Sequence, residues 1–397
     1  MKAFTFQAPP NILFEAGASK KLAELVAGYG AKRVLLVTDK GVRNAGLTKN
    51  AEAGLVAGGC ELTVFDDVEA DPPSHIIECA VALCRDKEIE LVASIGGGSA
   101  LDTAKLVAYL ARTPDRLDDI YGVGLAKGKR LPLLLAPTTA GTGSEVTPIA
   151  IVTTPTTEKK GVVSPVLIPD WAILDPELTL GLPASVTAAT GIDAMVHAIE
   201  AYTSKIKKNP MSDQLARQAL GLLSANVRRV CQNGSDLEAR SQMLLGSMLA
   251  GMAFANAPVA AVHALAYPIG AIFHVPHGLS NALVLRHVLE FNLSAAEALY
   301  AELAGIVRPG LQATGQAERA RAFIDEMASI GRDCQVPASL AAVGIGRDDL
   351  KKLAEDAMKQ TRLLVNNPRE LTLEDAYAIY SAAFDDGSNR YVQVSHG

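Results

Sequence analysis

The sequence contains few cysteines, and they follow no pairing pattern. Five cysteines are scattered along 397 residues without any CxxC spacing: Cys60, Cys79, Cys84, Cys231 and Cys334. This odd, dispersed set excludes a disulfide framework and a thiolate zinc site, and it fits a reducing compartment. The N-terminus, MKAFTFQAPPNILFEAG, also lacks the long apolar run of a signal peptide. We therefore expect a cytoplasmic protein.

The chain also has no excess of basic charge and no uninterrupted apolar span. Its formal net charge is −6 at pH 7 and it has no basic stripe, which argues against a nucleic-acid partner. The most apolar stretch, residues 243–273, is long enough to cross a bilayer, but four residues interrupt it: Asn256, Pro258, His263 and Pro268. We interpret this stretch as buried helix and expect no membrane association.

Length and patterning predict two domains, because 397 residues exceed what one hydrophobic core usually serves. In the first half, β-branched runs alternate with amphipathic segments, a pattern typical of βαβ units and a mostly parallel sheet. The predicted strands are residues 33–39, 61–67, 91–98 and 132–139, and the predicted helices are residues 19–29, 44–57, 74–87 and 99–112. After Pro183, helical patterns continue to the C-terminus. We expect an α/β domain over residues 1–183, an all-α domain over residues 184–397, and a cleft where they abut.

A glycine-rich turn follows the third predicted strand. The segment GGGSALDTAK spans residues 96–105, so glycines end the strand and Ser99 begins a helix. Free backbone N–H groups and the positive end of a helix favour phosphate. The segment is neither the GxGxxG fingerprint nor a Walker loop. On these residues alone, a phosphate site and a simple tight connection both stay open.

Two further features of the first half point to a dinucleotide. The loop APTTAGTGSEVTP at residues 136–148 offers hydroxyls and amides that suit ribose and pyrophosphate, although a plain polar loop is the alternative. Asp39 ends the first predicted strand. Its carboxylate can bind an adenosine ribose and repel a 2′-phosphate, which favours NAD over NADP. A helix cap is the competing role for Asp39.

The second half contains a candidate metal site. In GIDAMVHAIEAY, Asp193 and His197 are four residues apart and share one helical face. Further along, VHALAYPIGAIFHVPHG supplies His263 and His277. A carboxylate and three imidazoles suit Fe(II), Zn or Mn. Each histidine alone is more often a packed or surface residue, but buried imidazoles need polar partners, and one shared cation would satisfy them together.

In these motifs the chain resembles the iron-containing (group III) alcohol dehydrogenases, over nearly its whole length to about Phe384. The motifs GGGSALDTAK, PTTAGTGSEVT, GIDAMVHAIEAY and HALAYPIG with VPHG occur in the order and spacing of that family. The resemblance implies a dehydroquinate synthase-like architecture, in which a Rossmann-like dinucleotide-binding domain precedes a helical metal-binding domain. It also implies a catalytic Fe(II), with zinc as a possible replacement, on Asp193, His197, His263 and His277.

The resemblance further implies a set of cofactor residues. Asp39 would meet the adenosine ribose, Gly97, Gly98 and Ser99 would hold the pyrophosphate, and Lys160 would reach the cofactor's ribose. The remaining residues implied to line the cofactor are Asp102, Thr138, Thr139 and Thr142.

One position departs from the pattern of many family members. They carry a histidine, proposed as a proton relay, where this sequence has Tyr267. Tyr267, His274 or water would replace it here, and Tyr267 and Phe254 are also placed to supply pocket wall.

The expected activity is hydride transfer between NAD and a small alcohol or aldehyde whose oxygen lies on the metal. NADP is the less favoured cofactor, and the family suggests a homo-oligomer, a dimer or larger. A hydroxyacid–oxoacid transhydrogenase, a glycerol-type polyol dehydrogenase with one aspartate and two histidine ligands, and a non-enzymatic metal- or nucleotide-binding protein are the alternatives. The sequence does not define the pocket's substrate, since one or two methylenes of space decide such preferences.

Overall fold

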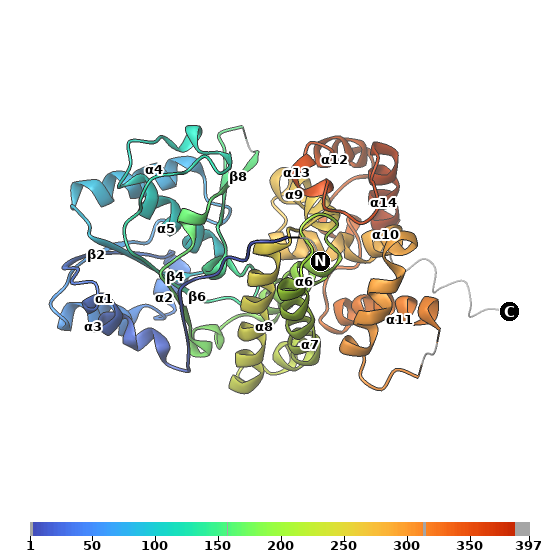
Figure 1. The fold of residues 1–397 in the computed structure, drawn as a ribbon, viewed down its shortest axis with the longest axis horizontal. Coiled ribbons are helices and arrows are strands. Elements are labelled where there is room, and N and C mark those ends of the chain that lie inside the picture. The colour runs from blue at the N-terminus through green and yellow to red at the C-terminus, as the bar shows by residue number, and fades with distance from the viewer. Residues whose placement is uncertain (1–2, 157, 313–314, 386–397) are drawn as a thin grey trace.

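The computed structural model describes residues 3–156, 158–312 and 315–385, which form an α/β part and a helical part lying side by side (Figure 1). The α/β part contains a six-stranded, entirely parallel sheet in the order β1-β9-β6-β4-β2-β3. Its strands are β1 (Asn11–Phe14), β2 (Arg33–Val37), β3 (Glu61–Phe65), β4 (Leu91–Gly96), β6 (Leu133–Pro137) and β9 (Trp171–Leu174).

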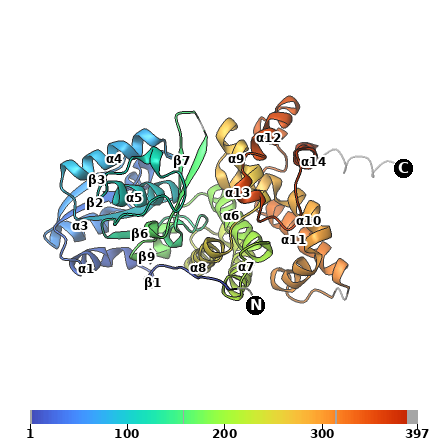
Figure 2. The same cartoon turned by 45° about the horizontal axis from the view of Figure 1, so that its top comes forward.

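Helices cover both faces of this sheet because its strands are apolar on both sides. Within β2, Leu35 and Val37 pack into one cluster with α4 (Ser74–Asp86) and α5 (Gly98–Leu110). The alternate residues Val34 and Leu36 pack into a second cluster with α1 (Leu22–Ala27) and α3 (Lys49–Ala57). The result is a three-layer α/β/α arrangement, visible edge-on in Figure 2.

The expected fold class is confirmed, and the four predicted strands correspond to β2, β3, β4 and β6. The helix predicted at residues 44–57 is instead divided into α2 (Lys40–Asn44) and α3 by a turn around Gly46, whose φ is +77°. A small sheet in the order β5-β8-β7 was not predicted. Its strands are β5 (Gly122–Val123), β7 (Ile149–Thr153) and β8 (Lys159–Val163).

The helical part follows β9. It contains most of a third cluster of buried apolar side chains, separate from the two that pack on the sheet. Its helices are α6 (Ala184–Thr203), α7 (Pro210–Gln232), α8 (Leu237–Asn256), α9 (Ala261–Phe273), α10 (His277–Val307), α11 (Gln316–Asp333), α12 (Leu350–Ala357), α13 (Thr361–Leu364) and α14 (Leu373–Asp385). Within the described ranges no single helix meets the length and hydropathy of a membrane span, and α8 with α9 does so only as a pair bent by 106°.

The sheet has a topological switch point at β2. The chain runs from β2 to β3 on one side and returns to β4 on the other. In open parallel sheets, ligands bind at the carboxyl ends of the strands where this reversal occurs. Here Asp39 follows β2 and the glycine-rich turn follows β4, and a Cβ placed on Gly96 would lie 3.9 Å from Asp39 Oδ2. These two sequence features are therefore neighbours in space.

The two parts meet through close backbone contact between the polar loop and α8. Gly143, in the left-handed region at φ +60°, faces Gly251. A Cβ on Gly251 would lie 2.9 Å from Gly143 Cα and 2.8 Å from Val146 Cγ2. The N-terminal segment adds a second connection, because the Gln7 N–H donates to Asn256 Oδ1 at 2.7 Å.

We expect Gly251→Ala to lower the free energy of unfolding by about 1–3 kcal/mol, because the added methyl group pushes against packed backbone. The measurement is thermal unfolding of the variant beside the unchanged protein. Gly305→Ala is the matched control, since Gly305 lies on α10 with open space around it and alanine favours helix. Equal melting temperatures for Gly251→Ala and the unchanged protein would show that this contact is not tight.

Candidate metal and cofactor site

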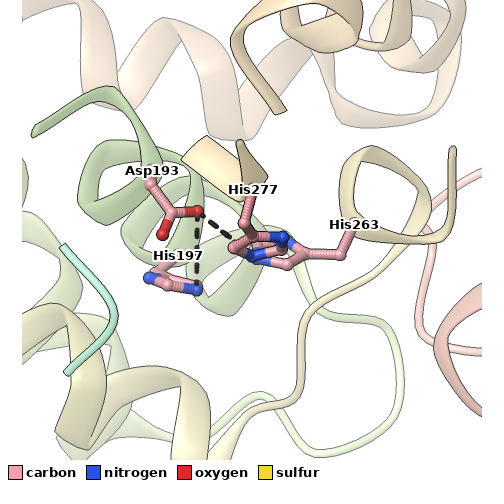
Figure 3. Close-up of side chains that lie close together, drawn as sticks. All are labelled: Asp193, His197, His263 and His277. Atoms are coloured by element: carbon pink, nitrogen blue, oxygen red, sulfur yellow. Dashed lines mark ion pairs between the residues drawn. The ribbon is translucent and has the colours of Figure 1, made fainter. Parts of the chain in front are cut away.

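Three helices bring the four predicted metal ligands together (Figure 3). Helix α6 carries Asp193 and His197 one turn apart, on a helix that is buried along most of its length. His263 lies in the first turn of α9, and His277 is the first residue of α10. Asp193, His197 and His263 are buried, and His277 is partly exposed.

The four side chains direct their donor atoms to one point. All four donor atoms lie within 4.8 Å of one another, and Asp193 Oδ1 lies 3.6–3.9 Å from the Nε2 atom of each histidine. Ligand atoms around a tetrahedral zinc at its usual bond lengths are about 3.3 Å apart, and longer bonds separate them further. One carboxylate oxygen and three imidazole nitrogens at this spacing fit a single divalent cation.

The surroundings keep two of the histidines, His197 and His277, in the form that binds metal. Burial lowers the pKa of His197 to about 3 and that of His277 to about 4, although Asp193 acts in the opposite direction. Burial also tends to raise the pKa of Asp193, but the facing histidines outweigh it and the pKa is lowered. At neutral pH His197 and His277 are therefore neutral imidazoles facing a carboxylate, the forms that metal binding requires.

Hydrogen bonds to the outer ring nitrogens fix which nitrogen faces the site. His263 Nδ1 lies 2.7 Å from Glu200 Oε2, and His197 Nδ1 lies 3.3 Å from the carbonyl oxygen of Gly141. Each Nδ1–H donates to its oxygen, so each Nε2 presents a lone pair inward. Gly141 belongs to the polar loop of the α/β part, and this loop therefore contacts a candidate ligand directly.

Glu200 was not singled out from the sequence, although it lies on α6 seven residues after Asp193. Its Oε1 accepts from the Val262 N–H at 2.7 Å, and its Oε2 accepts from His263. Helix α9 has no capping side chain of its own, so Glu200 supplies the acceptor that its first turn needs. One buried carboxylate thus anchors the start of α9 and orients its histidine.

Asn281 covers another side of the cluster. Its Nδ2 donates to Asp193 Oδ1 at 2.6 Å and lies 3.3 Å from Nε2 of both His263 and His277. Asn281 is fully buried and lies outside the cavity lining described next. It therefore holds the carboxylate from the side away from that cavity.

A cavity of about 190 Å³ connects the candidate metal site to the glycine-rich turn. Its α/β wall includes Gly98, Ser99, Asp102 and Thr142, and its helical wall includes the three histidines, Phe254 and Tyr267. The Phe254 ring stacks on His197 at 4.2 Å between centroids. The glycine-rich turn and the candidate metal cluster therefore face the same space.

The other predicted cofactor residues lie at the carboxyl end of the sheet. Gly97 precedes α5, and the Thr138 N–H donates to the Gly96 carbonyl at 2.9 Å. A Cβ on Gly97 would lie 3.8 Å from Thr139, and one on Gly98 would lie 2.8 Å from Thr142. Any residue larger than glycine at position 98 would press its Cβ against the Thr142 side chain of this loop.

Two predicted cofactor carboxylates already have partners in the protein. Asp39 Oδ1 accepts from the Val42 N–H at 2.9 Å and caps α2, which is the competing role that the sequence left open. Asp102 accepts from Ser144 Oγ at 2.6 Å and from the Ile151 N–H at 2.9 Å. Neither contact excludes a cofactor hydroxyl, because a carboxylate has about four acceptor positions.

The cavity is lined by Lys159 and not by Lys160, the lysine predicted to reach the cofactor's ribose. The Lys159 side chain is 5% exposed and lines the cavity, whereas the Lys160 side chain is 47% exposed and lies 3.7 Å from Glu158. Successive side chains of β8 point to opposite faces, so only one of the two can face inward. Lys160 lies over the Tyr121 ring, near the mouth of the cavity.

The two predicted relay residues differ in position. Tyr267 lies in the cavity wall, with its ring centroid 5.9 Å from that of His277. His274 is exposed and ends α9 in the left-handed conformation at φ 55°, outside the cavity lining. Of these two side chains, only that of Tyr267 lines the cavity.

Known proteins resemble this chain in sequence and fold over nearly its whole length. Long-chain-alcohol dehydrogenase 1 of Geobacillus thermodenitrificans (strain NG80-2) is 42% identical over 379 residues, which cover 95% of each chain. The crystal structure of a 1,3-propanediol oxidoreductase matches with a TM-score of 0.93 and 34% identity, covering 96% of this chain and 100% of that one. The sulfoacetaldehyde reductase of Bifidobacterium kashiwanohense, solved in complex with NAD+, matches with a TM-score of 0.88 and 28% identity, covering 98% and 100%.

Family models match both parts of the chain. The model for iron-containing alcohol dehydrogenase matches residues 9–176, and the model for the C-terminal part of the Fe-containing alcohol dehydrogenase family matches residues 187–384. The chain is therefore an oxidoreductase that belongs to the iron-containing alcohol dehydrogenase family.

Proposed function

We propose that this protein oxidises a small alcohol, or reduces the corresponding aldehyde, with NAD as the hydride carrier and Fe(II) on Asp193, His197, His263 and His277. The observation that carries the proposal is the shared cavity, in which a phosphate-binding turn and a four-ligand cluster face one another. A nicotinamide dinucleotide on the turn and a substrate at the cluster would meet there. A non-enzymatic binding protein has little use for this combination.

In this proposal the α/β wall of the cavity binds the cofactor. Gly97, Gly98 and Ser99 bind the pyrophosphate at the start of α5, where backbone N–H groups and the helix dipole favour phosphate. Thr138, Thr139 and Thr142 line the cofactor, with Asp102 behind them. Asp39 takes the hydroxyls of the adenosine ribose, and Lys160, which is exposed outside the cavity lining, would reach the cofactor's ribose from the mouth.

The catalytic end is formed by the histidine cluster and its apolar neighbours. Asp193, His197, His263 and His277 would hold the divalent cation, which would supply Lewis acidity at the substrate oxygen. Phe254 and Tyr267 exclude water beside the reacting carbon, and the Tyr267 hydroxyl is the side-chain group placed to pass on the proton. Burial raises the pKa of Tyr267, so its hydroxyl stays protonated at neutral pH.

The ligand set also favours an alcohol dehydrogenase over a glycerol-type enzyme, since three histidines converge on Asp193 rather than two. Iron is favoured over zinc on the same ground, because four protein ligands leave room for substrate only in an expanded coordination shell. We further propose a division into domains between Pro183 and Ala184, where α6 begins, a homo-oligomer of two or more chains, and a cytoplasmic location. The five unpaired cysteines support the last point.

The proposal is tested by turnover of protein reconstituted anaerobically with Fe(II) or Zn(II). We expect alcohol-dependent formation of reduced nicotinamide on addition of free NAD+. Turnover that requires an oxoacid partner and no added NAD+ would instead identify a transhydrogenase. NAD+ binding without any alcohol oxidation, over a panel of short alcohols, would contradict the proposal.

Cofactor choice gives a separate prediction at Asp39. We expect Asp39→Gly to weaken the preference for NAD+ over NADP+ by about 10- to 100-fold, because hydrogen bonds to a charged group contribute about 1.5–3 kcal/mol. The measurement is kcat/KM with each cofactor. Asp39→Ser is the paired variant, since it keeps a helix-capping oxygen but removes the charge. If the unchanged protein already prefers NADP+, the assignment of Asp39 is wrong.

A further inference from the structure

One side chain of the cavity carries a charge that no carboxylate balances. Arg362 lies on the short helix α13 and lines the cavity with His263, His277 and Tyr267. Its guanidinium lies close enough to Tyr267 to offset part of the rise that burial causes in the pKa of the Tyr267 hydroxyl. Within the described part of the chain, Arg362 forms no ion pair with an aspartate or glutamate.

The other cations of the cavity are matched by neighbouring anions. Lys159 Nζ lies 2.8 Å from Asp71 Oδ1, and Lys105, buried behind the wall, lies 3.5 Å from Asp102 Oδ1. The guanidinium of Arg362 is therefore the cavity's unmatched positive group in the described residues. It belongs to the helical wall, beside Tyr267, whereas the phosphate-binding turn belongs to the α/β wall.

We infer that the substrate of this protein is a short alcohol or aldehyde that also carries an anionic group, and that Arg362 binds this group. The inference rests on the proposed function, since it places the substrate's oxygen at the histidine cluster. A guanidinium presents forked N–H donors that match the paired oxygens of a carboxylate or sulfonate, and a short chain would span from the cluster to Arg362. A neutral alcohol has no anionic group to form an ion pair with this guanidinium.

The reaction itself is unaltered by this assignment. In the oxidative direction the substrate carbon gives a hydride to NAD+, and the hydroxyl gives up its proton. Arg362 takes no part in the transfer and acts as a specificity residue. Its effect therefore falls more heavily on kcat/KM for anionic substrates than on kcat/KM for neutral alcohols.

The test compares substrates of equal length that differ in charge: 3-hydroxypropanoate with 1,3-propanediol, and 4-hydroxybutanoate with 1,4-butanediol. In the unchanged protein we expect the anionic member of each pair to have the higher kcat/KM. In Arg362→Gln we expect the ratio of kcat/KM for the anionic member to kcat/KM for the matching diol to fall by about 10- to 100-fold. Lys359→Gln is the control for a general charge effect, because Lys359 is exposed near the mouth and paired with Asp356.

Binding of a non-reacting ligand provides a second readout that does not depend on turnover. Calorimetric titration of the NAD+ complex should give tighter binding of propanoate than of propanamide, and Arg362→Gln should remove this difference. Diols oxidised at least as efficiently as the hydroxyacids would overturn the inference and leave the proposed function standing. A loss in Arg362→Gln that falls on the KM of NAD+ for every substrate would also overturn it, by assigning Arg362 to the cofactor. If no alcohol of either kind reduces NAD+, the proposed function itself fails.

Discussion

Replacing His263 by alanine is expected to lower kcat/KM at least about 1,000-fold and to remove most of the bound metal. A Lewis acid at the substrate oxygen contributes several kcal/mol to the transition state, and each 1.4 kcal/mol corresponds to about tenfold in rate. His263 is central to the cluster, because its ring lies 4.7 Å from that of His197 and 5.3 Å from that of His277. The measurements are steady-state kinetics and metal content per chain.

Binding of NAD+ separates loss of the metal from loss of the fold in this experiment. The turn proposed to bind the pyrophosphate lies on the α/β wall, so we expect the NAD+ affinity of His263→Ala to stay close to that of the unchanged protein. His277→Ala should behave in the same way. His75→Ala is the control, since His75 is exposed on α4, away from the cavity. Full activity in either ligand variant would contradict the assignment of the cluster.

Replacing Glu200 by glutamine is expected to weaken metal binding by about 10- to 100-fold, the usual effect of losing a partner behind a metal-binding histidine. The change keeps the size of the side chain but replaces one acceptor oxygen by an NH2 group. That group would face either the Val262 N–H or the His263 Nδ1–H, so one donor loses its acceptor in either orientation. If the NH2 group faces His263, the ring's proton moves to Nε2 and blocks the metal.

The affinity of Glu200→Gln is measured by competition with a chelator for Zn(II), which needs no turnover. Glu302→Gln is the matched control, because Glu302 accepts a hydrogen bond from Tyr202, another side chain of α6, at a distance from the cluster. We expect the control to bind metal normally. Unchanged metal affinity in Glu200→Gln would show that the Glu200 contact does not orient His263.

Residues whose placement depends on local periodicity could be predicted from the sequence. Asp193 and His197 converge because they are one helical turn apart, and Gly98 lies in the turn because a strand precedes it and a helix follows. The sheet's central strands were predictable for a similar reason, since they form continuous apolar runs that are buried on both faces. The convergence of His263 and His277 on that helix came from resemblance to the family, not from spacing.

Residues whose role depends on tertiary contact could not be predicted in this way. A glutamate within a helix usually faces solvent, and only the packing of α9 against α6 shows that Glu200 is buried and doubly hydrogen-bonded. The choice between Lys159 and Lys160 depends on the phase of β8, which its pairing with β7 fixes. Arg362 lies 85 residues beyond His277, the last histidine of the cluster, in a short helix with no motif of its own.

The central claim is that Asp193, His197, His263 and His277 hold one divalent cation beside the nicotinamide. The most direct measurement is an anomalous-difference map at the iron edge, from crystals grown anaerobically with Fe(II). We predict a single strong peak about 2.0–2.3 Å from Asp193 Oδ1 and from the three Nε2 atoms. A peak bound by other residues, or four side chains that point away from one another around no peak, would contradict the account.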